Sequence, residues 1–207
     1  MNGYLASTIE AVVLEKQTEL GWVRKLIRPL QDRLSKFYNN IYVSDQKKLS
    51  YAYEIKSYFN DDSTPCCNIA RYTTDILIYE RLRENEWRPR VIVEAKLGSV
   101  TTHDAITYSQ KANTHKNVHP YLRYGILLGG FGGSLPGRLY RHGAFFDFMM
   151  AIDGEVLSKK EMDRLISTIR DEVEASRRLE VILFETRARG REKFTFLHRK
   201  LVLEGSE

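Results

Sequence analysis

Apolar residues recur at helical spacing over residues 5–37, and this spacing predicts a long amphipathic first helix. Ser7 with Glu10 three positions later fits a capping box, so we expect the helix to begin near Ser7. Gly21 and Pro29 interrupt the pattern and are expected to kink the segment or divide it into two helices. The apolar stripe consists of Ile9, Val12, Val13, Leu20, Val23, Ile27, Leu30 and Leu34.

Apolar runs of strand length follow this helix. Residues 51–59 alternate and are rich in aromatic side chains, which predicts a strand, and NDDSTP at 60–65 is typical of a turn. Two further runs, at 76–78 and 91–93, are separated by the charged segment 81–90. We expect these two runs to pair as an antiparallel hairpin.

The second half of the chain alternates between helix and strand patterns. We expect a helix over residues 102–117, a strand over 121–128, a buried strand or short helix over 145–152, an amphipathic helix over 158–179 and a strand over 193–203. The glycine-rich segment GGFGGSLPG follows the strand that ends at Leu128. It is interpreted as a plain surface connection, because the G-K-[ST] that completes a phosphate-binding loop is missing.

This order of a helix, three strands, a helix and a strand predicts an α/β fold with a mixed central sheet flanked by helices. We expect one domain over residues 1–207. Its core spans about residues 5–130, and a C-terminal extension of a helix and a strand spans about residues 131–207.

The composition, 43% hydrophobic and 29% charged, is that of an ordinary globular protein. No stretch approaches the roughly 20 apolar residues of a membrane span, and the N-terminus lacks a secretion pattern, so we expect a cytoplasmic protein without a membrane partner. The formal net charge of +5 permits a polyanionic partner without identifying one. The adjacent Cys66 and Cys67 are interpreted as reduced structural thiols.

Charged residues border the two apolar runs of the predicted hairpin. Asp75 opens the first run, and Glu94 and Lys96 close the second, two positions apart and therefore on one face of the strand. If Asp75 lies opposite on the neighbouring strand, two carboxylates and an ammonium group converge. Such a set suits a hard cation such as Mg²⁺, which prefers oxygen ligands. A cation there can activate a water and stabilise charge on a phosphate.

The sequence at this point resembles the PD-(D/E)XK superfamily of restriction-endonuclease-like nucleases. Thr74-Asp75 stands for the P-D element without its proline, and Glu94-Ala95-Lys96 stands for the E-x-K. The superfamily core is a helix, three strands, a helix and a strand. The resemblance covers residues 5–130 as an architecture and three residues as a motif. It implies catalysis by Asp75, Glu94 and Lys96, with Asp75 and Glu94 holding Mg²⁺, for which Mn²⁺ can substitute.

Members of the superfamily often add an acidic residue from the first helix and a polar residue from the helix after the lysine. Glu10 is our candidate for the first, although a capping role suits it equally well, and Glu15 and Glu54 are weaker choices. Gln110 is our candidate for the second, with Lys111 as a rival that can also contact nucleic acid. Ordinary solvated helix residues would look the same.

Basic and histidine residues elsewhere are less specific. Arg187, Arg189 and Arg191 lie in a basic turn that can either clamp a DNA backbone or form a solvated surface. The histidines do not form a pair in the H-E-x-x-H manner, so a zinc site is not favoured. These residues are His103, His115, His119, His142 and His198.

The leading hypothesis from sequence is a Mg²⁺-dependent DNA endonuclease, for which a homodimer is a compatible state. An alternative is a catalytically inactive nucleic-acid-binding module of the same fold. A third is a structural domain in which Lys96 merely pairs with Glu94 or Asp75.

Overall fold

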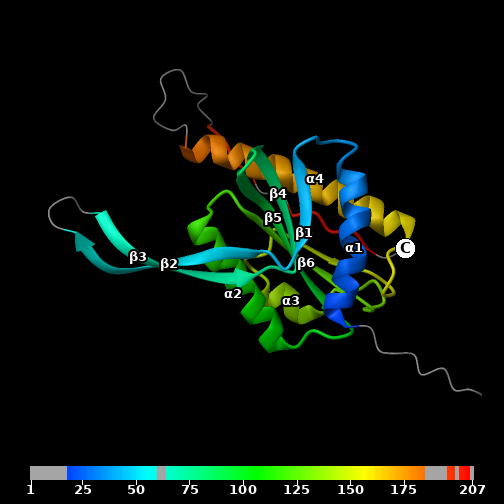
Figure 1. The fold of residues 1–207 in the computed structure, drawn as a ribbon. Coiled ribbons are helices and arrows are strands. Elements are labelled where there is room, and N and C mark those ends of the chain that lie inside the picture. Colours follow the sequence, from blue (N-terminus) through cyan, green and yellow to red (C-terminus); the bar gives the residue numbers. More distant parts are fainter. Residues whose placement is uncertain (1–17, 60–63, 185–194, 199–200, 206–207) are drawn as a thin grey trace, which may run out of the picture.

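The structure is a computed structural model that describes residues 18–59, 64–184, 195–198 and 201–205. Its elements follow one another along the chain as shown in Figure 1. They are α1 (Glu19–Leu34), β1 (Ile41–Asp45), β2 (Lys48–Phe59), β3 (Thr64–Thr73), β4 (Ile76–Arg83), β5 (Glu86–Leu97), α2 (Thr102–Val118), β6 (Arg123–Gly129), α3 (Gly137–His142), β7 (Phe148–Ala151) and α4 (Lys159–Phe184).

Five strands form a central sheet in the order β1-β4-β5-β6-β7. The pairs β1–β4 and β4–β5 are antiparallel, whereas β5–β6 and β6–β7 are parallel. The parallel pairs are joined through α2 and α3, because a parallel crossover needs a connection long enough to return to the same end of the sheet. The expected mixed sheet is therefore present.

Helices cover both faces of this sheet. Apolar residues of α1 and α4 pack on one face, against alternate positions of β4 and β5 such as Ile78 and Val93. On the other face, α2 and α3 pack over positions of opposite parity, including Leu77, Ile92 and Ile126. Alternate positions along each strand thus face two separate apolar layers, which explains the continuous apolar runs 76–78 in β4 and 91–93 in β5.

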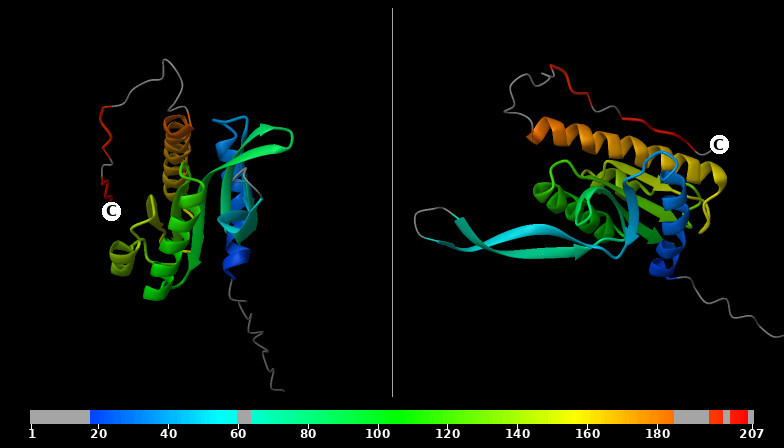
Figure 2. Two further views of the ribbon diagram at one scale, coloured as in Figure 1. Left: turned by 90° about the vertical axis from the view of Figure 1, so that its left-hand side faces the viewer. Right: turned by 45° about the horizontal axis from the view of Figure 1, so that its top comes forward.

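Strands β2 and β3 do not belong to the central sheet. They pair only with each other and project from the body as a two-stranded arm (Figures 1 and 2). The base of the arm rests on α2, where His115 Nδ1 lies 3.1 Å from the carbonyl oxygen of Ser50. Further out the side chains are mostly exposed, including Tyr53, Ile55 and Tyr58. The cysteines lie in β3 as free thiols.

With the arm set aside, the order α1, β1, β4, β5, α2, β6 has the expected sequence of a helix, three strands, a helix and a strand. The identity of the first strand was predicted wrongly. Residues 51–59 do form a strand, but it lies in the arm, and the sheet instead uses Ile41–Asp45. Thr64 and Pro65 belong to β3 rather than to the predicted turn, and 60–63 lie outside the described residues.

The first helix also differs from its prediction. It runs unbroken from Glu19 to Leu34 across Gly21 and Pro29, so the expected division into two helices is wrong, while the alternative of a kink stays a prediction. Thr18 is its N-cap, since its side chain accepts a hydrogen bond from the N–H of Gly21 at 3.1 Å. The predicted start at Ser7 lies outside the described residues.

The C-terminal part joins the same core. β7 pairs with β6, and α4 extends to Phe184, beyond the predicted end near residue 179. The predicted final strand is wrong for the described residues of that segment, because 195–198 and 201–205 have no regular structure and run beside α4 (Figure 2). The glycine-rich connection is held in place, since the N–H of Gly130 donates to the carbonyl of Gly154 at 2.8 Å.

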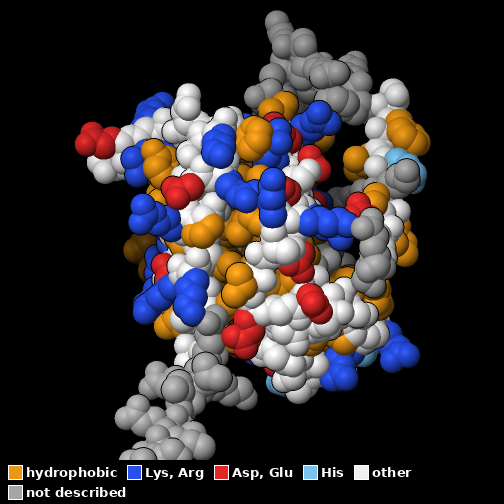
Figure 3. Space-filling view, turned by 90° about the vertical axis from the view of Figure 1, so that its right-hand side faces the viewer, with side chains coloured by type: hydrophobic (Ala, Val, Ile, Leu, Met, Phe, Trp, Pro, Cys, Tyr) orange, Lys and Arg blue, Asp and Glu red, His pale blue; other side chains and the backbone are white. Residues whose placement is uncertain are grey.

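Surface charge is mixed on the face drawn in Figure 3, where acidic and basic side chains are interspersed. The net charge of +5 therefore does not form a single positive field there. Within the described part of the chain, none of the helices combines the length and the apolar character that crossing a bilayer requires.

Candidate active site

The hairpin of β4 and β5 places the two predicted acidic residues next to each other. Ile76 pairs with Val93 across this ladder, so the next position puts Asp75 opposite Glu94. Opposed residues of an antiparallel pair share one face, with Cβ atoms roughly 4.5–5.5 Å apart. Asp75 Oδ2 also accepts a hydrogen bond from the N–H of Ala95 at 3.0 Å. The structure thus brings Asp75 and Glu94 together where β4 begins.

Glu94 is buried and makes two polar contacts. Its side chain is 1% exposed, and Oε1 accepts a hydrogen bond from the Tyr124 hydroxyl at 2.5 Å and pairs with Lys111 Nζ at 2.7 Å. Burial raises the pKa of Glu94 to about 7, and the negative charge of Asp75 adds to this, while Lys111 and Tyr124 oppose it. A single lysine therefore does not compensate the carboxylates of this site.

Lys96 lies on the same strand, two positions beyond Glu94, but has its own partner. Its Nζ is 3.2 Å from Oε1 of Glu19, which lies in the first turn of α1. Burial alone lowers the pKa of Lys96, but Tyr108 and Glu19 together raise it by more, to well above its ordinary value. Lys96 is therefore a permanent cation near neutral pH, suited to electrostatic work rather than to proton abstraction.

Each of the two acidic residues keeps one carboxylate oxygen without a hydrogen bond from the described residues. Oδ2 of Asp75 and Oε1 of Glu94 are engaged as above, which leaves Oδ1 and Oε2. Two carboxylate oxygens suit Mg²⁺, which is commonly held by one or two carboxylates and keeps several waters. Three or more grouped Asp, Glu, His or Cys side chains are not found in the described ranges.

Lys111, rather than Gln110, reaches the site from α2. Besides its pair with Glu94, Lys111 Nζ lies 3.4 Å from the carbonyl oxygen of Thr73, whereas Gln110 is exposed. Neighbouring residues of a helix point about 100° apart, so only one of the two can face the sheet. The catalytic role predicted for Gln110 is thus not supported by its position.

Several predicted residues cannot be placed. Glu10 and Glu15 lie outside the described residues, as do Arg187, Arg189 and Arg191. Glu54 is exposed on the arm, where its Oε2 accepts a hydrogen bond from Asn68 at 2.7 Å. Their proposed contacts with metal or DNA therefore stay predictions or, for Glu54, lack support.

Three residues of the site were not predicted from sequence. Glu19 was hidden because the helix start was assigned to Ser7, although Thr18 followed by an acidic residue is itself an N-cap pattern. Tyr124 and Tyr108 carry no local signal, since a tyrosine in an apolar strand or on a helix is usually a packing residue. Their roles follow only from the pairing of β5 with β6 and the packing of α2.

His115 is the buried histidine nearest to this site. Its ring stacks on Tyr124 with centroids 5.9 Å apart, and burial lowers its pKa to about 4. It is therefore neutral at physiological pH and packs between the arm and the sheet.

Comparison with known proteins adds no assignment. A scan against protein-family models gives no match, and a search of curated proteins likewise gives none.

Proposed function

We propose that this protein is a Mg²⁺-dependent nuclease of restriction-endonuclease-like fold that hydrolyses phosphodiester bonds in DNA. The observation that carries the proposal is the meeting of Asp75 and Glu94 at the start of β4 and the end of β5, with Lys96 two positions further along β5. Each of the two carboxylates retains an oxygen without a described partner, and the pair is under-neutralised. Such a site gains stability from a divalent cation.

The arrangement of elements supports the same fold family. A helix, three strands, a helix and a strand occur in that order around the central sheet, and the Asp and E-x-K positions lie on its two middle antiparallel strands. On this proposal the arm formed by β2 and β3 is an insertion between the first and second core strands. Fold alone does not define an activity, so the proposal rests on the site.

The residues of the site divide into two roles. Asp75 and Glu94 would hold Mg²⁺, which when bound supplies Lewis acidity and lowers the pKa of a water. Lys96 keeps its positive charge next to the carboxylates, where it would offset the negative charge that develops on the phosphate. Glu19 and Tyr108 position Lys96 and keep it protonated, and the N–H of Ala95 fixes the orientation of Asp75.

Cleavage assays test the proposal directly. Purified protein is incubated with supercoiled plasmid, linear duplex and single-stranded DNA in Mg²⁺, in Mn²⁺ or in EDTA. We expect metal-dependent cleavage, reduced roughly 100-fold or more in Asp75→Asn and Lys96→Met. Asp32→Asn is the matched control, because Asp32 lies near the end of α1 and pairs only with the exposed Arg28 among described residues. Its activity should equal that of the parent.

The results also separate the alternatives. Intact DNA under every metal condition, or variants as active as the parent, would rule out the nuclease. Salt-sensitive DNA binding without cleavage would instead favour an inactive nucleic-acid-binding module. A domain stabilised only by the pairs of Glu94 and Lys96 would gain no thermal stability from Mg²⁺, since an ion pair alone has no reason to bind it.

A further inference from the structure

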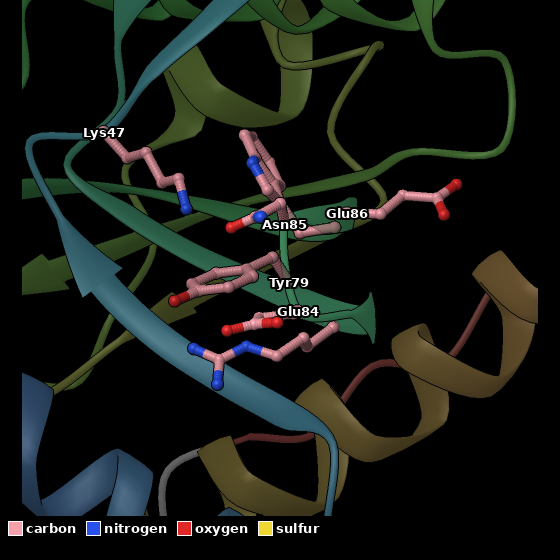
Figure 4. Close-up of a pocket in the computed structure, with 7 residues that line it drawn as sticks. Lys47, Tyr79, Glu84, Asn85 and Glu86 are labelled. Atoms are coloured by element: carbon pink, nitrogen blue, oxygen red, sulfur yellow. The ribbon is translucent and has the colours of Figure 1, made fainter.

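A pocket with two basic side chains lies on the same side of the sheet as Glu94, near the loop between β4 and β5. It is a pocket of about 240 Å³ in which an ammonium group lies between aromatic rings (Figure 4). Lys47 Nζ is 3.8 Å from the ring centroid of Tyr79 and 3.9 Å from that of Trp87. The residues that matter for its chemistry are Lys47, Tyr79, Arg81, Glu84, Asn85 and Trp87.

The two cations of this pocket, Lys47 and Arg81, are not paired with its two carboxylates, Glu84 and Glu86. In the described part of the chain, neither Lys47 nor Arg81 forms an ion pair with a carboxylate; Arg81 instead stacks over Tyr42, 4.3 Å from its ring centroid. Burial, and then the charge of Arg81, lowers the pKa of Lys47. Glu86 extends away from Lys47 and pairs with Arg83 at 3.6 Å. Glu84 also lines the pocket and, unlike Glu86, has no ion pair among the described residues.

Aromatic rings hold a cation but leave its hydrogen bonds unfilled. An ammonium group has three donors and no acceptor, and a guanidinium has five donors. A ring face stabilises the positive charge by about 0.5–2 kcal/mol, but it does not provide full hydrogen-bond acceptors for these N–H groups. Two such cations facing one small cavity, with the Asn85 amide beside them, match a group that has several anionic oxygens.

The pocket is also connected to the candidate active site. The carbonyl oxygen of Lys47 accepts hydrogen bonds from the N–H of Thr74 at 3.0 Å and from its hydroxyl at 2.9 Å, and Thr74 directly precedes Asp75. Tyr79 and Trp87 pack on the cluster that contains Ile92 and Tyr124, on the face to which Glu94 points. The pocket residues on β4 lie four and six positions beyond Asp75, about 13–20 Å along the strand.

We propose that Lys47, Arg81 and Asn85 form a phosphate-binding pocket, which holds a backbone phosphate of the nucleic acid at a distance from the scissile bond. That the phosphate belongs to a nucleic acid rests on the proposed function, whereas the binding of a phosphate is inferred from the pocket itself. Successive nucleotides of one strand are about 3.4 Å apart along the duplex axis. For a duplex whose axis runs parallel to β4, the bound phosphate would lie about four to six nucleotides from the bond that is cut.

The test measures DNA binding without divalent metal, so that no cleavage is needed. Fluorescence anisotropy of a labelled duplex is recorded over a series of salt concentrations for the parent, Lys47→Met and Arg81→Gln. Each lost phosphate contact should lower the slope of log K against log salt by about one and weaken binding about eightfold at 0.1 M salt. Met fills the slot between the rings without charge, which separates charge from packing.

Two further variants make the test specific. Arg83→Gln removes the same charge two positions further out on β4, where the side chain is 86% exposed, and should bind like the parent. Glu84→Gln removes the competing carboxylate and should bind more tightly. Equal losses in Arg81→Gln and Arg83→Gln would show general surface charge and overturn the pocket. So would a Lys47→Met protein that melts earlier but binds DNA like the parent.

Inorganic phosphate separates the two sources of the ligand. Trp22 is 1% exposed and its indole N–H donates to the carbonyl of Glu155, so phosphate-induced changes in emission should come from Trp87. Saturable quenching by phosphate together with unchanged DNA affinity in Lys47→Met would assign the pocket to a free phosphate and reject the nucleic acid. DNA binding that needs the pocket without cleavage in any metal would instead refute only the nuclease.

Discussion

Two glutamates of adjacent strands are buried to a similar degree and yet have opposite electrostatic surroundings. Glu80 on β4 is 6% exposed and Glu94 on β5 is 1% exposed. Glu80 pairs with Arg90 and Arg177, and although burial raises its pKa, these partners lower it by more. Glu94 has one lysine, lies near Asp75, and its pKa is raised to about 7.

The difference separates a carboxylate that neighbouring cations neutralise, which is Glu80, from one that has too few cations around it, which is Glu94. Around Glu80, guanidinium groups joining β4, β5 and α4 supply more hydrogen-bond donors than the carboxylate needs, and Glu180 shares the excess. Around Glu94, the same sheet supplies too little positive charge. Strongly perturbed carboxylates of the second kind are typical of functional sites, because a ligand or metal completes them.

Removing Arg90 should produce the largest effect on stability. Arg90→Met leaves Glu80 and Glu180 short of a buried cation, and breaking a buried pair typically costs about 3–5 kcal/mol. Urea unfolding at neutral pH measures this loss. The double variant Arg90→Met/Glu80→Met should recover part of it, because apolar groups of similar volume can replace a buried pair. A single variant as stable as the parent would contradict a structural role for this network.

The pH dependence of stability should distinguish the two glutamates by sign. The folded pKa of Glu94, about 7, exceeds the ordinary value of 4.5, so its contribution is present below pH 4.5 and is lost as pH rises through 7. Without metal, this loss is on the order of 3 kcal/mol. Glu80, with a lowered pKa, contributes stability above its unfolded pKa that is lost in acid.

Unfolding in EDTA at a series of pH values measures both contributions. Glu94→Gln should remove the decline between about pH 4.5 and 8, because glutamine carries no charge to bury. The control Glu86→Gln, which alters an exposed carboxylate of the same strand, should keep it. A decline of unchanged size in Glu94→Gln would show that another group is responsible.

Sequence was sufficient for the part of the site that depends on local periodicity. Glu94 and Lys96 share a face because they are two positions apart in a strand, and the paired apolar runs predicted the hairpin that opposes Asp75 to Glu94. Helix phase was harder. Choosing between Gln110 and Lys111 requires the rotation of α2 to within one residue, about 100°, and a helix with a mostly polar surface gives little indication of it.

The elements that sequence missed have weak patterns for identifiable reasons. β1 alternates between buried and part-buried residues, but it is only five residues long and its pattern is too short to stand out. β3 has nearly continuous exposure and shows no apolar alternation. α1 tolerates Pro29 in its interior because apolar packing of Leu26, Leu30 and Leu34 against the sheet outweighs the missing hydrogen bond. In α1, tertiary burial thus outweighed the local helix-breaking signal of Pro29. In β1 and β3, the local sequence contained no comparable sign of how the strand pairs.

Divalent metal should stabilise the site by an intermediate amount. At ten times its dissociation constant, a ligand specific for the folded state contributes about 1.4 kcal/mol, or a few degrees in melting temperature. The gain should be larger at about pH 8 than at pH 6, because protons compete for Glu94. Asp75→Asn and Glu94→Gln should each abolish it, and Glu80→Gln should leave any metal-dependent shift intact. A shift that survives Glu94→Gln would place the cation elsewhere.

Lys111 should give the smallest change in stability and the most specific change in pH dependence. Lys111→Met removes the only lysine paired with Glu94 among described residues, so the pKa of Glu94 should rise further. Near neutral pH the carboxyl then simply remains protonated, and the cost should stay below about 1.4 kcal/mol, the equivalent of one pKa unit. The decline in stability should move to higher pH, as should the pH at which Mg²⁺ begins to stabilise the protein.

In Arg90→Met, protonation cannot relieve the unpaired carboxylates in the same way, because they lie among other guanidinium groups that favour the ionised form. If Lys111→Met instead destabilised the protein as much as Arg90→Met, Lys111 would be a structural partner of Glu94, and the contrast between the two glutamates would be lost.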